Sequence, residues 1–247
     1  MPDIPKLDNE QLSSKAHKIL LAMLREGAFD QSGKLPPEEI LAQKLGISRS
    51  VVRDVLAAFE SEGFITRRRG IGTIINKHVL KVTSRLDLEK EFLEEVADCG
   101  YTPSVGFVTP SVIKADEEAA ERLEIPVGEE LIVVERLILA NGQPAIYCID
   151  HLSSSLIIDN NYSLNDLKPP IFSFLEQYCH CSVQMDLTRI APYLTDDHLA
   201  EILNVSKGTP ILYLDELGYD IHQKPVLWSK EYYAPGIFEF TVLRRKI

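Results

Sequence analysis

The strongest constraint on the fold is a pattern that recurs at a distance of 80 residues. Residues 116–128 align without a gap on residues 196–208 and share the same amino acid at five of thirteen positions. Pro144 and Pro225 then each open the second strand of a hairpin. The same order of helix, strand, turn, proline and strand, present twice, indicates a duplication. We therefore expect two half-units related by a pseudo-two-fold axis, with a pocket between them lined by matching strands of both.

The region around the repeat has the pattern of an α+β domain with an antiparallel sheet. Asn141 and Gly142 form a strong hairpin signal between two apolar stretches, and strands that hairpins connect are antiparallel. Helices are predicted at residues 88–99, 116–123 and 195–203 and after Pro170. Strands are predicted at residues 105–113, 131–140, 145–152, 183–191, 211–219 and 226–233.

The charge of the chain is distributed unevenly. Residues 1–78 hold 12 Lys and Arg against 10 Asp and Glu, whereas the rest hold 14 against 27, which together give the net charge of −11. Residues 44–77 alone contain seven basic and three acidic side chains. A basic tract on an acidic chain is typical of a small phosphate-contacting module joined to a domain with another task.

The N-terminal third predicts three helices followed by a hairpin. The first helix spans residues 9–26, and the second begins at Pro36 and Pro37. Ser48 is a good N-cap for a third helix that ends at Gly63, and two short strands follow. This order of elements is that of a winged helix-turn-helix.

The third helix and the hairpin carry the residues suited to DNA. Arg49 and Arg53 lie one turn apart, and arginine has the best shape for bidentate bonds to guanine in the major groove. A glycine-flanked arginine hairpin can approach the adjacent backbone or minor groove closely. In the alternative interpretation the three helices only pack together and the arginines are merely solvated. The predicted DNA-binding residues are Ser48, Arg49, Ser50, Arg53, Arg67, Arg68, Arg69 and Gly70.

Residues 9–76 resemble the GntR family of bacterial transcription regulators. The motifs are Leu35-Pro36-x-Glu38-x-x-Leu41-Ala42, Ile47-Ser48-Arg49-x-x-Val52-Arg53, Glu62-Gly63-x-Ile65 and Gly70-x-Gly72-Thr73. Two departures matter, because Glu39 stands where the family usually has a DNA-contacting arginine, and Ile71 replaces a basic residue of the wing. The resemblance therefore implies operator binding without implying the family's consensus operator.

Residues 80–240 resemble the UTRA effector domain of the HutC branch of that family. The motifs are Leu123-x-Ile125-x-x-Gly128, Glu135-Arg136-Leu137, Gly142-x-Pro144 and Pro225-Val226-x-x-Ser229-x-Glu231-Tyr232-Tyr233. The resemblance implies a chorismate-lyase-like antiparallel sheet with flanking helices, which binds a small metabolite and forms a homodimer.

The same resemblance implies an effector site, with departures that narrow its ligand. Ile138 replaces the second arginine of the Arg-x-Arg found in many relatives, and Pro170 stands where they often have an anion-binding serine. A ligand with one anionic group or none, such as a nucleoside, sugar or amino-acid derivative, is therefore expected. The predicted effector-binding residues are Ser84, Arg136, Cys148, Glu231 and Tyr233.

Other patterns give no catalytic or metal site. Cys179, His180 and Cys181 are too close in sequence to converge on one ion, and Asp196 and Asp197 suit a helix N-terminus. The sequence contains no hydrolase or nucleotide-binding motif, so no cofactor is expected. Four cysteines without a Cys-x-x-Cys pair, and no apolar leader or span, predict a cytoplasmic protein that does not contact a membrane.

We therefore predict a DNA-binding domain at residues 1–76, a linker at 77–86 and an effector-binding and dimerisation domain at 87–247. The predicted function is a metabolite-responsive repressor of a transport or catabolic operon, which an effector releases from an inverted-repeat operator on double-stranded DNA. One alternative is a small-molecule enzyme of chorismate-lyase-like fold fused to a DNA-binding module. Another is an architectural DNA-binding protein without an effector.

Overall fold

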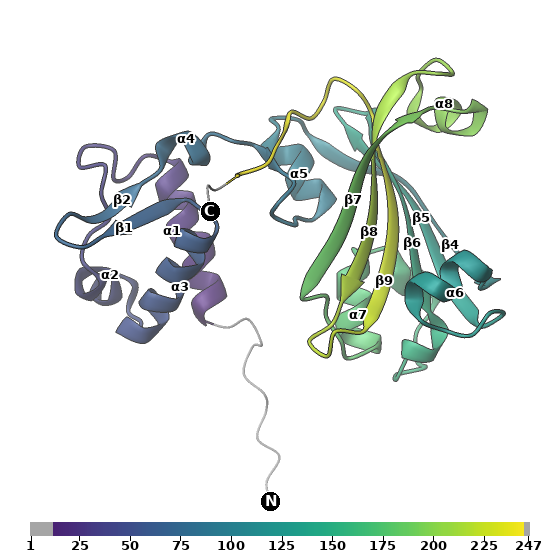
Figure 1. Cartoon of the computed structure of the whole chain (residues 1–247), viewed down its shortest axis with the longest axis horizontal. Coiled ribbons are helices and arrows are strands. Elements are labelled where there is room, and N and C mark those ends of the chain that lie inside the picture. The colour runs from purple at the N-terminus through teal and green to yellow at the C-terminus, as the bar shows by residue number, and fades with distance from the viewer. Residues whose placement is uncertain (1–11, 245–247) are drawn as a thin grey trace, which may run out of the picture. The chain divides into compact units, whose positions relative to one another are not determined.

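The computed structural model describes residues 12–244 and divides the chain into two compact units (Figure 1). The first unit comprises the chain up to Glu89 together with the segment from Phe240, and the second unit is Lys90–Glu239. The start of the first predicted helix, near Asp8 and Asn9, lies outside the described residues. Each unit has its own hydrophobic core.

The first unit contains the predicted winged helix-turn-helix. Its elements are α1 (Leu12–Arg25), α2 (Glu38–Leu45), α3 (Arg49–Ser61) and the antiparallel strands β1 (Ile65–Arg68) and β2 (Gly72–Ile75). Gly46 takes a left-handed conformation with φ 67°, which ends α2 and turns the chain toward α3. The Ser48 side chain accepts a hydrogen bond from the backbone N–H of Val51 at 3.3 Å, as an N-cap does.

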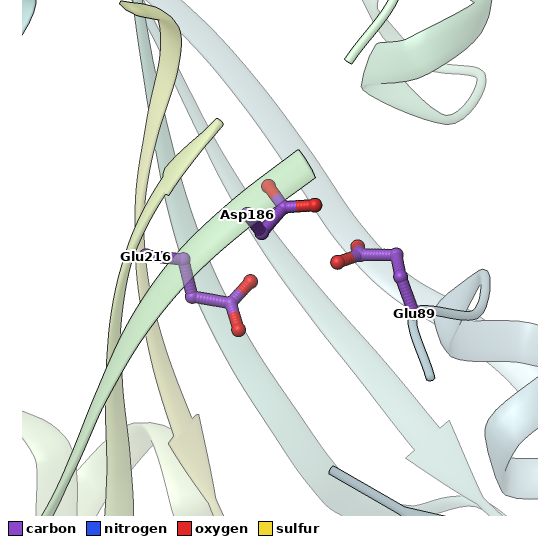
Figure 2. A group of neighbouring side chains, drawn as sticks. All are labelled: Glu89, Asp186 and Glu216. Atoms are coloured by element: carbon purple, nitrogen blue, oxygen red, sulfur yellow. The ribbon is translucent and has the colours of Figure 1, made fainter. Parts of the chain in front are cut away.

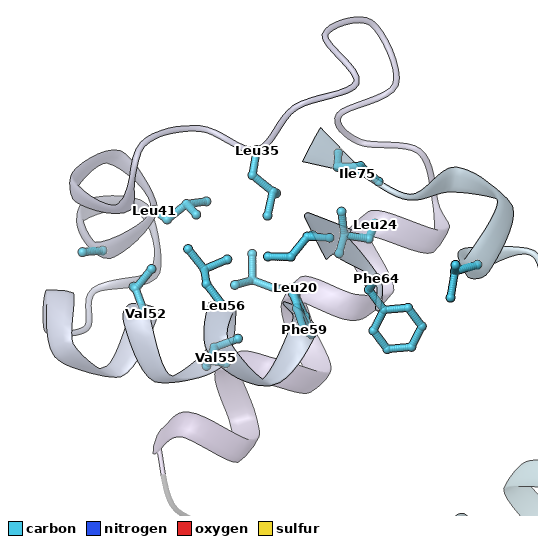
Figure 3. Packing of buried hydrophobic residues seen from close by; sticks show 14 residues of the cluster. Leu20, Leu24, Leu35, Leu41, Val52, Val55, Leu56, Phe59, Phe64 and Ile75 are labelled. Carbon is cyan, nitrogen blue, oxygen red and sulfur yellow. The ribbon is translucent and has the colours of Figure 1, made fainter. Parts of the chain in front are cut away.

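The core of the first unit forms where the apolar faces of the three helices meet the hairpin (Figure 3). Val52, Phe59 and Leu20 are almost completely buried there. Because these residues recur at helical spacing, the opposite face of α3 is left to solvent. The core therefore fixes which side chains of α3 can reach DNA.

The segment predicted as a linker is structured and belongs to the first unit. It contains α4 (Lys77–Leu80) and β3 (Ser84–Arg85), and β3 pairs in parallel with β10 (Phe240–Thr241) from the end of the chain. Arg85 donates to the main-chain oxygen of Glu62 at 2.6 Å, forms an ion pair with Asp87 and lies over the ring of Phe64. The buried guanidinium thereby attaches β3 to the C-terminal end of α3.

The second unit is built on a six-stranded antiparallel sheet in the order β4-β5-β6-β9-β8-β7. The strands are β4 (Pro103–Lys114), β5 (Glu130–Ala140), β6 (Gln143–Ser153), β7 (Met185–Leu194), β8 (Pro210–Tyr219) and β9 (Pro225–Tyr233). Asn141 and Gly142 both have positive φ, as the hairpin between β5 and β6 requires.

The sheet order confirms the α+β fold and has the symmetry that a duplication requires. Strands β4, β5 and β6 mirror β7, β8 and β9, and the two halves meet at the pair β6–β9. Asp116 and Asp196 cap the equivalent helices in the same way, and Glu124 and Asn204 end them in left-handed conformations with φ 53°. The repeated sequence therefore corresponds to a repeated structure.

Helices cover both faces of the sheet. The residues of α6 (Glu117–Leu123) and α8 (Asp197–Leu203) pack on one face, and those of α7 (Ile171–Tyr178) pack on the other. Helix α5 (Phe92–Asp98), which is shorter than predicted, and the short 3-10 helices Ser154–Leu156 and Leu164–Leu167 complete the unit. No helix within residues 12–244 combines the length and apolar character needed to cross a membrane.

Candidate functional site

The solvent-facing side of α3 presents the polar residues that the sequence singled out. Ser48, Arg49, Ser50 and Arg53 are all exposed. The Nε atom of Arg53 lies 3.6 Å from a carboxylate oxygen of Glu38, but the arginine side chain keeps 62% of its surface in solvent. Such an exposed ion pair contributes little to stability, so Arg53 can exchange this partner for another acceptor.

The three arginines of the hairpin differ in their surroundings. Arg67 lies 3.3 Å from Glu60 and 4.0 Å from Glu38, and its backbone N–H donates to Glu60 at 2.9 Å. Arg67 therefore braces the hairpin against α2 and α3. Arg68 and Arg69 are exposed at the tip beside Gly70.

Lys34 is a basic residue near the hairpin tip that the sequence reasoning missed. Its ammonium donates to the main-chain oxygen of Ile71 at 3.0 Å, and its backbone forms a bridge with Ile74. The residue therefore adds an exposed positive charge beside the tip. Only the chain path brings it there, because 37 residues separate Lys34 from Ile71.

Four of the five predicted effector residues share one face of the sheet in the second unit. Arg136 on β5 is paired with Cys148 on β6, and Cys148 is paired with Glu231 on β9. Tyr233 lies two residues beyond Glu231, so it points to the same face. All four residues are buried. Ser84, the fifth predicted residue, lies in β3 of the first unit and does not share this face.

Arg136 occupies an interior strand and is only 4% exposed. Its guanidinium donates to the main-chain oxygens of Leu167, Lys168 and Pro169, which precede α7. One guanidinium nitrogen lies 3.9 Å from Asp150 Oδ2, which is too far for a hydrogen bond. Most N–H groups of the Arg136 guanidinium therefore donate to the backbone.

Asp150 is a buried carboxylate that the sequence reasoning missed, and it is 2% exposed. Its Oδ1 accepts hydrogen bonds from the hydroxyl of Ser229 at 2.7 Å and from the thiol of Cys148 at 3.2 Å. Its Oδ2 has no hydrogen-bond partner among the described residues. The signal in the sequence was an aspartate in phase with the inward residues of an apolar strand. A buried carboxylate oxygen without a hydrogen bond is costly.

Helix α5 contributes a further carboxylate to this region. The hydroxyl of Tyr233 donates to Glu231 Oε2 at 2.7 Å and lies 3.5 Å from Glu95 Oε2. Burial raises the pKa of Glu95 to about 7, although Lys90 opposes the shift. Burial likewise raises the pKa of Tyr233. The phenol therefore stays neutral and acts as a donor between two carboxyl groups.

Two acidic residues extend the site onto β7 and β8 (Figure 2). Asp186 and Glu216 carry carboxylate oxygens within 4.8 Å of each other, and Thr188 donates to Glu216 at 2.8 Å. Burial raises the pKa of Glu216, and the charge of Asp186 raises it further. We refer to Glu95, Asp150, Glu216 and Glu231 together as the carboxylate cluster.

The Cys179-His180-Cys181 segment and Asp196 both lie at the ends of helices. Cys179 is buried at the end of α7, Cys181 is half-buried and His180 is exposed. The Asp196 side chain accepts from the backbone N–H of Leu199 and caps α8. Neither group lies beside the carboxylate cluster in the sheet register.

The winged helix with exposed arginines and the duplicated sheet with a buried polar face define a bacterial transcriptional regulator with an effector domain. The model of bacterial regulatory proteins of the gntR family matches residues 12–75, and that of the UTRA domain matches residues 98–239, more than half of the chain. The chain belongs to the gntR family, in the group that carries a UTRA domain.

Known relatives span nearly the whole chain. The HTH-type transcriptional regulator GgaR of Escherichia coli K12 is 24% identical over 94% of this chain and 91% of its own length. The HTH-type transcriptional repressor NagR of Bacillus subtilis is 26% identical over 81% of each chain. The solved structure of the possible regulator YydK of Bacillus subtilis matches 94% of this chain and 99% of its own with a TM-score of 0.74 at 24% identity.

Proposed function

We propose that this regulator is a metabolite-responsive repressor of a transport or catabolic operon. One observation carries the proposal: a single chain combines an exposed arginine-bearing helix with a separate buried face that holds an unpaired carboxylate oxygen. The first feature suits operator DNA and the second suits a small ligand. The relative NagR is named a repressor, which supports the direction of control. The proposal assigns the protein to the cytoplasm, where it meets DNA.

Within the DNA-binding surface, we assign base reading to α3 and phosphate contacts to the hairpin. Arg49 and Arg53 are exposed one turn apart, as bidentate contacts to base edges require. The exposed Arg68 and Arg69 are placed to neutralise phosphates without reading sequence. Ser48, Ser50 and Gly70 complete the surface, with Lys34 beside the hairpin tip and Arg67 as its brace.

Within the second unit, we assign effector binding to Arg136, Cys148, Glu231 and Tyr233, together with Asp150. Their placement on one face, with strands from both halves of the duplication, supports the assignment. For Ser84 the assignment rests on the family resemblance alone.

We also propose a homodimer formed through the second unit and bound to an inverted repeat. The edge strands β4 and β7 carry large apolar side chains that are exposed, and such patches mark interaction surfaces. A two-fold dimer would place half-sites about one helical turn, ~10 base pairs, apart. The exposed residues are Val105, Val112 and Ile113 on β4 and Met185, Leu187, Ile190 and Leu194 on β7.

The test uses the full chain and DNA from the regions upstream of its own and neighbouring genes. Mobility-shift titrations should find one fragment bound far more tightly than scrambled DNA, and footprinting should reveal two symmetric half-sites. A metabolite of the controlled operon should weaken that binding, and the operator must weaken metabolite binding by the same factor. Specific binding that no metabolite changes would reject the effector role, and a monomer at micromolar concentration in sedimentation would reject the dimer.

A further inference from the structure

The buried face of the second unit is more acidic than a site for an anion should be. The carboxylate cluster brings four acids together over β6, β8, β9 and α5, and Asp186 adds a fifth at its edge. Resting on the proposed function, we propose that the effector is an organic cation, which the carboxylate cluster binds through an amine or guanidinium group.

The basic residues near the cluster are already occupied. Arg136 donates to three main-chain oxygens, and Lys90 Nζ lies 2.5 Å from a carboxylate oxygen of Asp98. Neither residue forms a hydrogen bond with Asp150, although Arg136 approaches it to 3.9 Å. Arg136 therefore gives its hydrogen bonds to the backbone, and Asp150 Oδ2 receives none from the described residues.

The hydrogen bonds of Asp150 also point to a cationic ligand. Asp215, a buried aspartate on the opposite face, accepts from Arg122, Arg189 and Trp228 at 2.6 to 2.8 Å. Asp150 is equally buried, yet its Oδ2 has no donor among the described residues. An ammonium or guanidinium supplies only donors, whereas a phosphate or carboxylate would leave this oxygen unpaired and add repulsion.

The spacing of Asp150 and Glu216 suits separate donors of one extended molecule. Asp150 pairs with Ser229, and Ser229 pairs with Glu216, so the backbone positions of the two acids are separated by two strand spacings, about 9–10 Å. A Ca²⁺ or Mg²⁺ ion needs its oxygen ligands within about 2.6 Å of one point. An extended molecule with separate donors can reach both acids and the hydroxyl of Ser229 between them.

The experiment measures binding to the full chain by thermal shift and calorimetry with matched probes. The cationic probes are putrescine, agmatine and glucosamine. The neutral counterpart is 1,4-butanediol for the first two and glucose for the third. Glucosamine 6-phosphate, inorganic phosphate and Mg²⁺ or Ca²⁺ chloride complete the set. We expect at least one organic cation to raise Tm by several degrees at millimolar concentration, while its neutral counterpart leaves Tm unchanged.

Three variants then locate the binding. Asp150→Asn and Glu216→Gln should each weaken the bound cation at least tenfold, because each removes one charge and keeps the side-chain shape. Asp197→Asn is the matched control, since it removes an exposed charge from α8 on the opposite face and should leave Kd unchanged. Using two cluster variants keeps the test valid if one of them folds poorly.

The outcomes separate this inference from the proposed function. Binding of only a neutral or anionic probe, weakened by Arg136→Ala but not by Asp150→Asn, would keep the effector site and overturn the cationic ligand. Stabilisation by the metal ions alone, or by no cationic probe, would also overturn it. The proposed function fails separately if no metabolite changes operator binding.

Discussion

Arginine has opposite surroundings in the two units. In the first unit, Arg53 leaves 62% of its side chain in solvent and has one loose carboxylate partner. In the second unit, Arg136 is 4% exposed and bonded to three backbone oxygens. An exposed guanidinium keeps its hydration and can exchange partners, whereas a buried one must be compensated by fixed groups. Arg53 is therefore free to exchange its partner for an external one, whereas Arg136 is fixed to the segment before α7.

The largest expected effect comes from removing the buried arginine. Arg136→Ala should lower the free energy of unfolding of the second unit by about 3–5 kcal/mol, because it leaves Asp150 and three carbonyls without their cation. Denaturant unfolding followed by tryptophan fluorescence measures the change, since Trp228 lies in this unit. Lys207→Ala, which removes an exposed cation whose partner Asp197 is also exposed, is the control and should have little effect. Equal effects of the two variants would break the comparison.

The exposed arginine should show the reverse behaviour. Arg53→Ala should cost roughly 1–3 kcal/mol of operator binding and relax the preference at one base pair. The unfolding of the first unit should hardly change, because the ion pair with Glu38 is exposed. Titrations against operator and scrambled DNA, with thermal unfolding as the control, test both parts. A loss of stability without a loss of specificity would contradict the assignment of α3.

The stability of the second unit should depend on pH through its buried carboxylates. Burial raises the pKa of Glu95 from 4.5 to about 7, with Lys90, Tyr233, Glu216 and Asp98 around it. The folded state therefore favours the protonated acid. The contribution of Glu95 to the free energy of unfolding is complete below pH 4.5 and is lost as the pH rises through 7. Between pH 5 and 8 the second unit should lose about 1–2 kcal/mol, less than the full shift at ~1.4 kcal/mol per pH unit because Glu95 is only partly buried.

Glu95→Gln tests this pH effect. The variant should flatten the loss of stability between pH 5 and 8, measured by denaturant unfolding at both values. Exposed Glu124→Gln on the same unit should leave the slope as it is. An unchanged slope in Glu95→Gln would mean that another group titrates.

The smallest effect separates neighbouring arginines of the hairpin. Arg68→Ala should weaken all DNA sequences alike and lower the slope of log K against log salt by about one unit. Arg67→Ala should change the slope less, because Arg67 is paired with Glu60 and Glu38. Binding titrations at several salt concentrations measure both slopes. Equal slopes would show that Arg67 leaves its acidic partners on DNA.

The parts of the fold that depend on local patterns were predictable from sequence. Gly46 ends α2 and Ser48 begins α3. Asn141 and Gly142 form the turn of a hairpin. These residue types favour the backbone angles that such positions require. The repeat predicted the two halves of the sheet. The alignment also placed Arg136 and Glu231 on equivalent hairpins, which the sheet then brought to one face.

The missed residues depend on contacts between segments that are distant in sequence. Asp150 meets Ser229 across 79 residues, and Glu95 meets Tyr233 across 138. The pairing of β3 with β10, which ties the end of the chain to the first unit, is equally distant in sequence. A single sequence contains no record of such pairs, so the carboxylate cluster could not be assembled from it.

The sequence by itself determined the order of elements, the duplication, the family and the exposed arginines of α3, because helical and strand periodicity decide which side of each element faces the core. Only the tertiary structure decided which charges became buried partners. In the folded chain Arg136 donates to the backbone before α7, and Arg67 is paired with two acids. One oxygen of Asp150 is left without a hydrogen bond from the described residues. The physical reason is that the energy of a buried charge depends on the few groups within hydrogen-bond reach, and the fold alone brings those groups together.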